Sequence, residues 1–406
     1  MFDTLPPPVP RLHRSLVIAL LVIALALRLG WGLSRPSDEA SLAALPDQSE
    51  YLQLARNLLQ GRVMVFYDSR FADTVAAYRM PGYPLFLAAC GGNIVTARVA
   101  QAVIDTSIVL AVLLLARRAG IDRLQMGVAA ALVAFHPYLI YFSATLLSET
   151  LFAAMLAWAM VCLSANGRWR TIVGVVLLLG SVYVRPSAIA LPVVVLMTAA
   201  LVRPTLSRGS FWRLGPGAMA ILLTALILLP WAWRNRQVTG HWVFTTTNSG
   251  VTLYDGLNPR ADGSSDQSSF STWPELKFMG EVERSNYLGA IAKEYAQQHP
   301  WRAAELAGRK LLRFWSPIPL SAQYGRSVIN LAAGLLIVGP LLLLAAVGLW
   351  RGRMSRSLKL FLLAPALYFS LVHAMTIGSL RYRVPIDVPL AVLAGAGVMR
   401  RKSVEA

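Results

Sequence analysis

Residues 15–33 read SLVIALLVIALALRLGWGL, an apolar run in which Arg28 is the single charged residue. A helix needs about 20 predominantly apolar residues to cross the hydrocarbon core of a bilayer, so this run is long enough to span one. No small-residue cleavage pattern follows it, and we therefore expect a retained signal anchor and not a cleaved signal peptide. This stretch places the chain among membrane proteins.

The composition of the whole chain agrees with that class. Of its 406 residues, 56% are hydrophobic and 14% are charged, whereas soluble domains carry about 25% charged residues. Similar apolar runs recur along the sequence, and together they predict an all-α polytopic membrane protein with about ten transmembrane helices in a single unit. The unit covers residues 1–406, and the expected spans are 15–33, 94–116, 125–143, 147–165, 171–184, 187–202, 215–233, 327–350, 358–377 and 384–399.

The net charge of +18 follows the ends of these runs. With the N-terminus in the cytoplasm, the short turns on the outer side carry only Arg185, Arg381 and Arg383. The positive-inside rule then predicts a multi-pass protein of the inner (plasma) membrane with both termini in the cytoplasm. We interpret the excess charge as a topology signal and expect no nucleic-acid partner. The basic residues assigned to the cytoplasmic side are Arg11, Arg14, Arg117, Arg118, Arg123, Arg168, Arg170, Arg203, Arg208, Arg213, Arg351, Arg353, Arg356, Lys359, Arg400, Arg401 and Lys402.

Two long segments, residues 34–93 and 234–326, fall on the outer side and are expected to cap the bundle with surface helices. The first contains LPDQSEYLQLARNLLQG at residues 45–61, a stretch with helical amphipathicity. A helix of this kind is expected to lie in the interface plane of the membrane. The second segment contains a similar pair at 284–297 and 301–315. The apolar face of the helix in the first segment comprises Tyr51, Leu54, Ala55, Leu58 and Leu59.

Several charged residues of the outer side have simple structural explanations. Asp47, followed three residues later by Glu50, fits a capping box, and Gly61 suits the C-terminal cap of the same helix. Glu149 fits the N-terminal end of a span, where a helix dipole favours a carboxylate, and Arg185 is a suitable structural partner for it.

As a group, these residues indicate a functional site. Ionisable side chains close to the membrane are costly and mark functional positions by default. Arginine forks bind phosphate oxygens in a bidentate manner, and a nearby carboxylate can accept a proton from an attacking hydroxyl. The combination predicts a site for a lipid-linked phosphate on the outer side. The residues that carry this prediction are Asp47, Arg79, Glu149, Arg185, Arg234, Arg236, Arg381 and Arg383.

Metal and redox chemistry have weak support in the sequence. Cys90 and Cys162 are too few for a disulfide framework and lie in apolar surroundings. The histidines show no zinc-ligand spacing. The sequence indicates no certain cofactor and leaves a divalent metal open.

Five stretches in a fixed order carry a resemblance to a known family. They are PDQSEYLQLARNLLQG at 46–61, YRMPGYPLFLA at 78–88, HPYLIYFSATLLSETLF at 136–152, PWAWRNRQVTGHWVFTTTNSGVTLYDGLNP at 230–259 and LRYRVPIDVPL at 380–390. Along nearly its whole length the chain resembles membrane glycosyltransferases of the C superfamily. It looks most like the family 39-like clan of protein O-mannosyltransferases and lipid A aminoarabinose transferases.

The resemblance implies a polyprenyl-phosphate sugar donor and inverting transfer outside the cytoplasm. It implies an Asp general base at a motif like Asp-Glu-x-x-Tyr, which Asp47 and Tyr51 match, with Gln48 in place of the second acid. Glu149 matches a second acid that is assigned here as catalytic. The expected substrate-binding residues are Tyr51, Arg79, Tyr83, Arg185, Arg381, Tyr382 and Arg383.

The expected reaction is transfer of a hexose or pentose to an envelope glycan, lipid or protein hydroxyl, with membrane lipids as further partners. A glycan or lipid acceptor is favoured, and polar groups of the second outer segment, Asn248, Tyr254, Asp255 and Asn258, suit sugar hydroxyls. Three alternatives stay open. They are a transporter or flippase that uses charges near the bilayer midplane such as Arg28 and Asp105, a glycan polymerase or ligase, and a non-catalytic subunit of envelope assembly.

Overall fold

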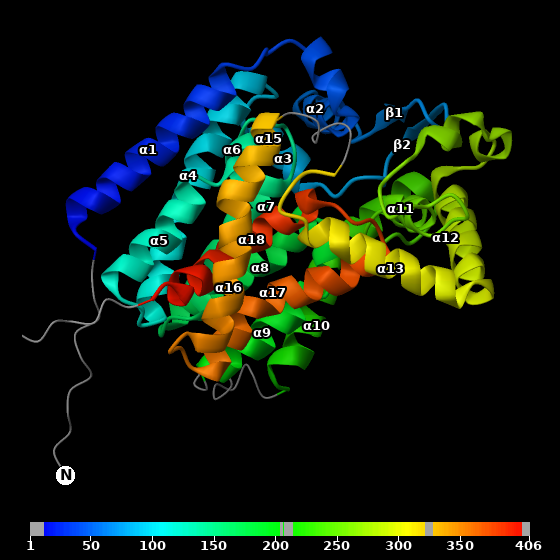
Figure 1. The fold of residues 1–406 in the computed structure, drawn as a ribbon. Helices are drawn as coiled ribbons and strands as arrows, with labels where there is room; N and C mark the ends of the chain where they lie inside the picture. Colours follow the sequence, from blue (N-terminus) through cyan, green and yellow to red (C-terminus); the bar gives the residue numbers. More distant parts are fainter. Residues whose placement is uncertain (1–11, 204–205, 207–213, 321–327, 400–406) are drawn as a thin grey trace, which may run out of the picture.

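The computed structural model of the chain describes residues 12–203, 206, 214–320 and 328–399. Figure 1 shows long helices gathered in one bundle, with shorter helices and a small hairpin beside it. Some basic residues assigned above to the cytoplasmic side lie outside the described residues, namely Arg11, Arg208, Arg213, Arg400, Arg401 and Lys402.

The helices of the bundle occupy the positions of the apolar runs, because lipid-facing backbone must satisfy its hydrogen bonds within the segment. They are α1 (Arg14–Leu33), α4 (Ile94–Arg118), α5 (Arg123–Ala134), α6 (Pro137–Ser143), α7 (Glu149–Leu163), α8 (Arg168–Val184), η2 (Pro186–Ala188), α9 (Leu191–Val202), α10 (Pro216–Thr239), α15 (Val328–Ala333), η7 (Gly334–Val338), α16 (Gly339–Arg351), α17 (Arg356–Met375) and α18 (Leu380–Gly397).

The two long outer segments contain shorter elements. They are η1 (Ala40–Ala44), α2 (Pro46–Leu59), β1 (Phe66–Asp68), β2 (Asp73–Val75), α3 (Gly82–Ala89), α11 (Asn248–Gly256), η5 (Ser268–Thr272), η6 (Pro274–Lys277), α12 (Glu281–Gln298) and α13 (Pro300–Trp315). Strands β1 and β2 form an antiparallel hairpin in which Phe66 pairs with Val75.

The structure confirms a predominantly helical membrane protein but not the count of about ten spans. By length and composition, five described helices can cross a membrane, or six if the pair α5–α6 is one span. That pair bends by 44° at the break between Ala134 and Pro137, because a proline cannot continue the hydrogen-bond ladder of α5. Helix α7 is apolar but has only 15 residues, and α9 is also short.

Glycines bring α16 and α18 into backbone contact. A Cβ atom on Gly348 would lie 1.8 Å from the carbonyl oxygen of Leu393, and one on Gly397 would lie 2.1 Å from that of Leu344. Small residues at a helix interface allow this approach, which favours van der Waals packing where the hydrophobic effect contributes little.

A buried arginine donates hydrogen bonds to carbonyl oxygens at the end of an interrupted helix. Arg28 on α1 forms an ion pair with Asp105 on α4 and donates to the carbonyl oxygens of Val133 (3.1 Å) and Ala134 (2.9 Å). These carbonyls lie at the C-terminus of α5, where helical partners are missing. Both Arg28 and Asp105 are fully buried, so these two charges satisfy each other inside the protein.

Helix α2 packs part of its apolar face against protein and differs from its prediction at its N-terminus. Leu54 and Ala55 of its apolar face are buried in the core clusters, whereas Leu59 at its C-terminal end is 53% exposed. The expected capping box is wrong, because Asp47 lies inside the first turn and forms no cap hydrogen bond. Gly61 confirms the expected C-terminal cap, with φ of +65° and a hydrogen bond from its amide to Leu58.

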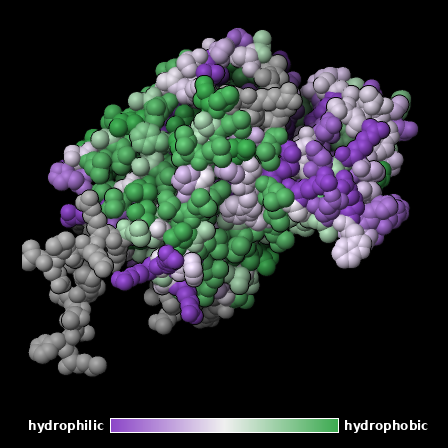
Figure 2. Space-filling view, viewed as in Figure 1, coloured by the Kyte–Doolittle hydropathy of each residue, from purple (hydrophilic) through white to green (hydrophobic). Residues whose placement is uncertain are grey.

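The two outer segments pack against each other beside the bundle. Glu281 at the start of α12 accepts hydrogen bonds from the amides of Ala76 (3.0 Å) and Ala77 in the first segment, and Arg284 pairs with Asp73 at 2.7 Å. Figure 2 shows hydrophobic residues gathered over the bundle and hydrophilic residues over the part formed by α11, α12 and α13. The outer segments therefore form a polar cap on an apolar body.

Candidate functional site

Asp47 lies between two arginines that come from opposite ends of the chain. Arg79, in the segment between β2 and α3, donates to Asp47 Oδ1 at 2.6 Å, and Arg381, at the start of α18, donates to Asp47 Oδ2 at 2.9 Å. The side chain of Asp47 is 30% exposed, against 12% for Arg79 and 17% for Arg381. The carboxylate is thus held from both sides and still accessible.

Glu149 lies deeper in the same cluster. It is the first residue of α7, and its fully buried carboxylate accepts a hydrogen bond from Arg381 Nε. Arg185, between α8 and η2, approaches the same carboxylate at 3.7 Å, which is the structural pairing suggested by the sequence. Glu149 therefore connects the two arginines behind Asp47.

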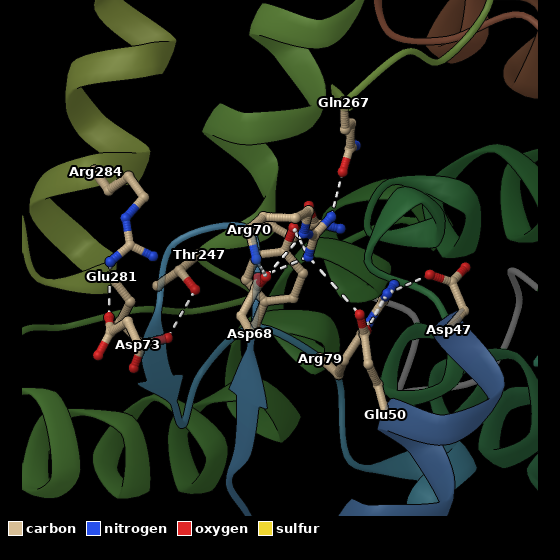
Figure 3. Close-up of polar contacts among 12 residues, drawn as sticks. Asp47, Glu50, Asp68, Arg70, Asp73, Arg79, Thr247, Gln267, Glu281 and Arg284 are labelled. Atoms are coloured by element: carbon tan, nitrogen blue, oxygen red, sulfur yellow. Dashed lines mark hydrogen bonds and ion pairs between the residues drawn. The ribbon is translucent and has the colours of Figure 1, made fainter. Parts of the chain in front are cut away.

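Glu50 belongs to the site although its role was assigned above to a helix cap. It lies one turn after Asp47 on the same face of α2 and accepts from Arg79 Nε at 2.9 Å. Figure 3 shows Arg79 between Glu50 and Asp47, with Arg70 on the far side of Glu50. Arg70 pairs with Asp68 at 2.7 Å and lies 3.8 Å from Glu50. The i, i+3 spacing could have indicated Glu50, whereas no local signal indicates Arg70.

Gln48 takes an inward position, which accounts for the missing second acid. Its Oε1 accepts a hydrogen bond from the amide of Leu146 at 2.9 Å, and the residue is buried. A carboxylate at this position would be buried between α2 and the loop before α7. The glutamine therefore links two elements of the site without adding charge.

Aromatic side chains surround the arginines. Arg79 lies over the ring of Tyr51 at 5.2 Å from its centroid, and Arg185 lies over Tyr382 at the same distance. Tyr382 stacks on His373 with centroids 4.4 Å apart. Tyr83 is fully buried below Tyr51 and donates its hydroxyl to Gln101 at 2.7 Å, so it supports Tyr51 from inside the protein.

Arg383 does not join this cluster. It is fully buried on α18, pairs with Asp387 at 3.0 Å and donates to the carbonyl oxygens of Phe314 (3.2 Å) and Ser316 (2.7 Å). Its partners lie at the C-terminus of α13. Of the arginines in the Leu-Arg-Tyr-Arg stretch, Arg381 therefore faces Asp47 and Arg383 holds α13 against the bundle.

The charges around Asp47 determine its protonation. Burial alone would raise the pKa of Asp47, but the guanidiniums of Arg79 and Arg381 outweigh burial and hold this pKa well below its usual range. A divalent cation needs several oxygen ligands, whereas both oxygens of Asp47 already face arginines. Within the part of the chain that the structure describes, no group of three or more His, Cys, Asp and Glu residues could hold a metal ion. This donor set does not fit a metal.

Arg35 adds a further positive charge next to the cluster. Its guanidinium stacks on Trp31 at 3.8 Å from the ring centroid, and the residue is exposed. Tyr141 lies within electrostatic reach of Arg35, Arg381 and Glu149. None of the ion pairs among the described residues involves Arg35. Asp47, Glu50 and Glu149 balance Arg79, Arg185 and Arg381, and Arg35 adds a positive charge beside them.

Comparison with known proteins identifies the fold. The chain aligns with the archaeal oligosaccharyltransferase AglB from Archaeoglobus fulgidus, solved with an inhibitory peptide and a dolichol-phosphate, at a TM-score of 0.58 and 14% identity over 95% of this chain and 50% of that chain. The apo form of the Archaeoglobus fulgidus oligosaccharyltransferase aligns at 0.55 and 14% identity, over 94% and 50%. ArnT from Cupriavidus metallidurans bound to undecaprenyl phosphate aligns at 0.39 and 14%, over 94% and 77%.

The chain spans about half the length of the archaeal oligosaccharyltransferase, and that alignment shows a shared fold. The shared fold agrees with the resemblance to membrane glycosyltransferases that the sequence carries. No protein-family model and no curated protein matches the sequence.

Proposed function

We propose that the chain transfers a sugar from a polyprenyl-phosphate donor to a hydroxyl acceptor on the extracytoplasmic side of the membrane, with inversion at the anomeric carbon. The observation that carries the proposal is the accessible Asp47 carboxylate held between Arg79 and Arg381 on a GT-C fold. The archaeal oligosaccharyltransferase with this fold was solved with a dolichol-phosphate, which supports a lipid phosphate as ligand.

In this reaction Asp47 is the general base. It takes the proton of the acceptor hydroxyl while that oxygen attacks the anomeric carbon of the donor. The bond between this carbon and the phosphate oxygen breaks, and its electron pair stays on the phosphate. Arginines placed beforehand around the leaving group stabilise the charge that develops there, which is an electrostatic effect of fixed groups.

The phosphate is assigned to Arg381 and Arg35. Arg79 and Arg381 are each held by two carboxylates in the free protein, Arg79 by Asp47 and Glu50 and Arg381 by Asp47 and Glu149. Arg35 stacks on Trp31, whose ring lies 6.5 Å from that of Tyr141, and Tyr141 is within electrostatic reach of Arg381. Arg35 thus adds a positive charge beside the balanced cluster. Glu149 is fully buried behind Arg381 and Arg185, so we assign it as a positioning residue and keep Asp47 as the base.

The transporter alternative depended on Arg28 and Asp105 as charges available to a substrate. In the structure both are fully buried, paired with each other and bonded at the end of α5. No observation among the described residues therefore favours transport over transfer.

A lipid profile of cells tests the proposal. Cells that lack the protein and cells that carry Asp47→Asn should accumulate the same polyprenyl-phosphate sugar and lose the same envelope glycan. Loss of a general base lowers the rate about 10²–10⁴-fold. Glu39→Gln is the matched control, because Glu39 is an exposed acid of the same outer segment that pairs with Arg56, and it should leave the profile unchanged. Wild-type lipids in Asp47→Asn cells would refute the assigned base.

The same profile tests the phosphate assignment. Arg35→Ala should also accumulate the donor, since hydrogen bonds to charged groups correspond to about tenfold or more in affinity. Arg62→Ala, which removes another exposed arginine of the segment, should not accumulate it. Equal profiles for the two variants would remove Arg35 from the site.

A further inference from the structure

A polar cavity in the second outer segment is absent from the mechanism above. It has a volume of about 550 Å³ and lies where α11, the loop after it and η5 meet. Aromatic, carboxylate and amide side chains line it together. Those used below are Tyr254, Asp255, Asn258, Asp262, Asp266 and Trp273.

The lining has the chemistry of a carbohydrate site. The rings of Tyr254 and Trp273 lie 5.7 Å apart at 53°, and Trp273 is partly exposed, so aromatic faces are offered to an apolar sugar face. Carboxylates and an amide around them can form hydrogen bonds with hydroxyl groups. Ligand pockets commonly combine apolar surfaces with a few polar groups of this kind. Asp262 and Asp266 are the exposed acids of the lining and Arg260 is an exposed base, so the rim offers both acceptors and donors to sugar hydroxyls.

The wall of the cavity is a built structure. Asp255 is 2% exposed and accepts hydrogen bonds from the Ser265 hydroxyl (2.6 Å), the Asp266 amide (2.9 Å) and Gln267 Nε2 (3.1 Å). Asn258 donates to the carbonyl oxygen of Tyr254 at 2.8 Å. The loop is thereby fixed on α11, as a binding surface requires.

Continuous polar contacts join this wall to Asp47. Gln267 accepts a hydrogen bond from Arg70, and Arg70 lies 3.8 Å from Glu50. Glu50 in turn accepts from Arg79 at 2.9 Å, and Arg79 donates to Asp47. Figure 3 shows Gln267, Arg70, Glu50, Arg79 and Asp47 in this order across the two outer segments. The cavity is therefore anchored to the group that deprotonates the acceptor.

We infer that this cavity binds the acceptor, and that the acceptor is a glycan whose far sugars stack on Trp273 while its reactive hydroxyl reaches Asp47. The inference rests on the proposed transferase function and narrows its acceptor to a glycan. It separates the recognition of the acceptor, in the second outer segment, from the chemistry, in the first.

The experiment uses the purified full chain in lipid nanodiscs with saturating polyprenyl-phosphate sugar. The varied substrate is the delipidated envelope-glycan fraction of cells that lack the protein, whose acceptor positions are unmodified. Trp273→Ala and Asp262→Asn remove a stacking face and an exposed carboxylate of the rim. Trp301→Ala is the matched control, because Trp301 is 88% exposed on α13 and does not line the cavity.

We expect the KM for the glycan to rise about tenfold or more in both cavity variants, with kcat and the donor KM unchanged, and no change in Trp301→Ala. Unchanged glycan KM values in an active protein overturn the cavity while leaving the transferase intact. Transfer only to the lipid fraction and not to the delipidated glycan also overturns it. A wild-type protein that transfers to neither fraction refutes the proposed function itself. Unfolding temperatures equal to that of the wild type confirm that the variants are folded. If Trp273→Ala is unstable, the glycan KM of Asp262→Asn, a change at an exposed position, tests the inference instead.

Discussion

At the scale of single residues, Asp47, Glu50 and Glu149 neutralise Arg79, Arg185 and Arg381, and Arg35 adds one further positive charge. The apparent conflict is that such pairing makes Asp47 a weak base, since a carboxylate stabilised as an anion holds a proton poorly. Donor binding resolves it in our proposal, because the phosphate competes for Arg381 and leaves Asp47 Oδ2 with fewer donors. The paired state of the free protein is then a resting arrangement that keeps Asp47 ionised until both substrates are present.

This arrangement predicts an unusual pH dependence. The ionised form of Asp47 is the base, and Arg79 and Arg381 hold its pKa well below the usual range despite burial. Activity is therefore lost only when the pH falls through this lowered value, and kcat/KM should stay flat from about pH 8 to about pH 5. Arg79→Gln removes one of the two positive charges that stabilise the Asp47 carboxylate. The pKa of Asp47 in this variant should therefore rise, and the acid limb of its profile should move to higher pH.

The measurement is kcat/KM against pH, which reports the free enzyme. Arg62→Gln provides a control of equal charge change at an exposed position of the same segment. An acid limb above pH 5 in the wild type, unmoved in Arg79→Gln, would show that another group is the base.

At the scale of elements, the amphipathic and apolar patterns predicted the positions of the helices better than the surfaces against which the helices pack. The ten apolar runs coincide with helices because a helix satisfies its own backbone hydrogen bonds, which both the protein interior and the lipid require. The pattern of α2 predicted its apolar face but not that Leu54 and Ala55 on this face pack into the protein core. Arg70 and Gln267 lie 197 residues apart, and only the folded chain brings them together.

Helix α11, which carries one wall of the cavity, depends on glycines. A Cβ on Gly250 would lie 1.8 Å from the Ser285 carbonyl oxygen on α12, and one on Gly256 would lie 1.9 Å from that of Thr376 after α17. Gly250→Ala should therefore lower the free energy of unfolding by about 1–3 kcal/mol through overpacking.

Gly308→Ala on α13 is the control for that change. Nothing lies within 4 Å of a Cβ at Gly308, so alanine should stabilise the helix by about 0.5–1 kcal/mol. Opposite signs in chemical denaturation of the two purified variants are the expected result. Destabilisation of equal size in both would mean that close contact of α11 with α12 is not the cause.

At the scale of the whole molecule, Arg383 connects the membrane bundle to the outer cap. Its guanidinium joins Asp387 on α18 to the carbonyl oxygens of Phe314 and Ser316 at the end of α13, and His136 Nε2 lies 3.2 Å from the same aspartate. These charges are fully buried, so removing one of them leaves the other without compensation.

Asp387→Ala should therefore cost about 3–5 kcal/mol, whereas Glu305→Gln, at an exposed ion pair on α13, should cost less than about 1 kcal/mol. The double variant Arg383→Met with Asp387→Leu removes both charges and should recover much of the loss. Thermal unfolding in nanodiscs measures stability, and amide hydrogen exchange of residues 300–315 reports whether α13 loosens before the bundle. A double variant as unstable as Asp387→Ala would show that the cost lies in packing or in the lost contacts to α13, and not in an uncompensated charge.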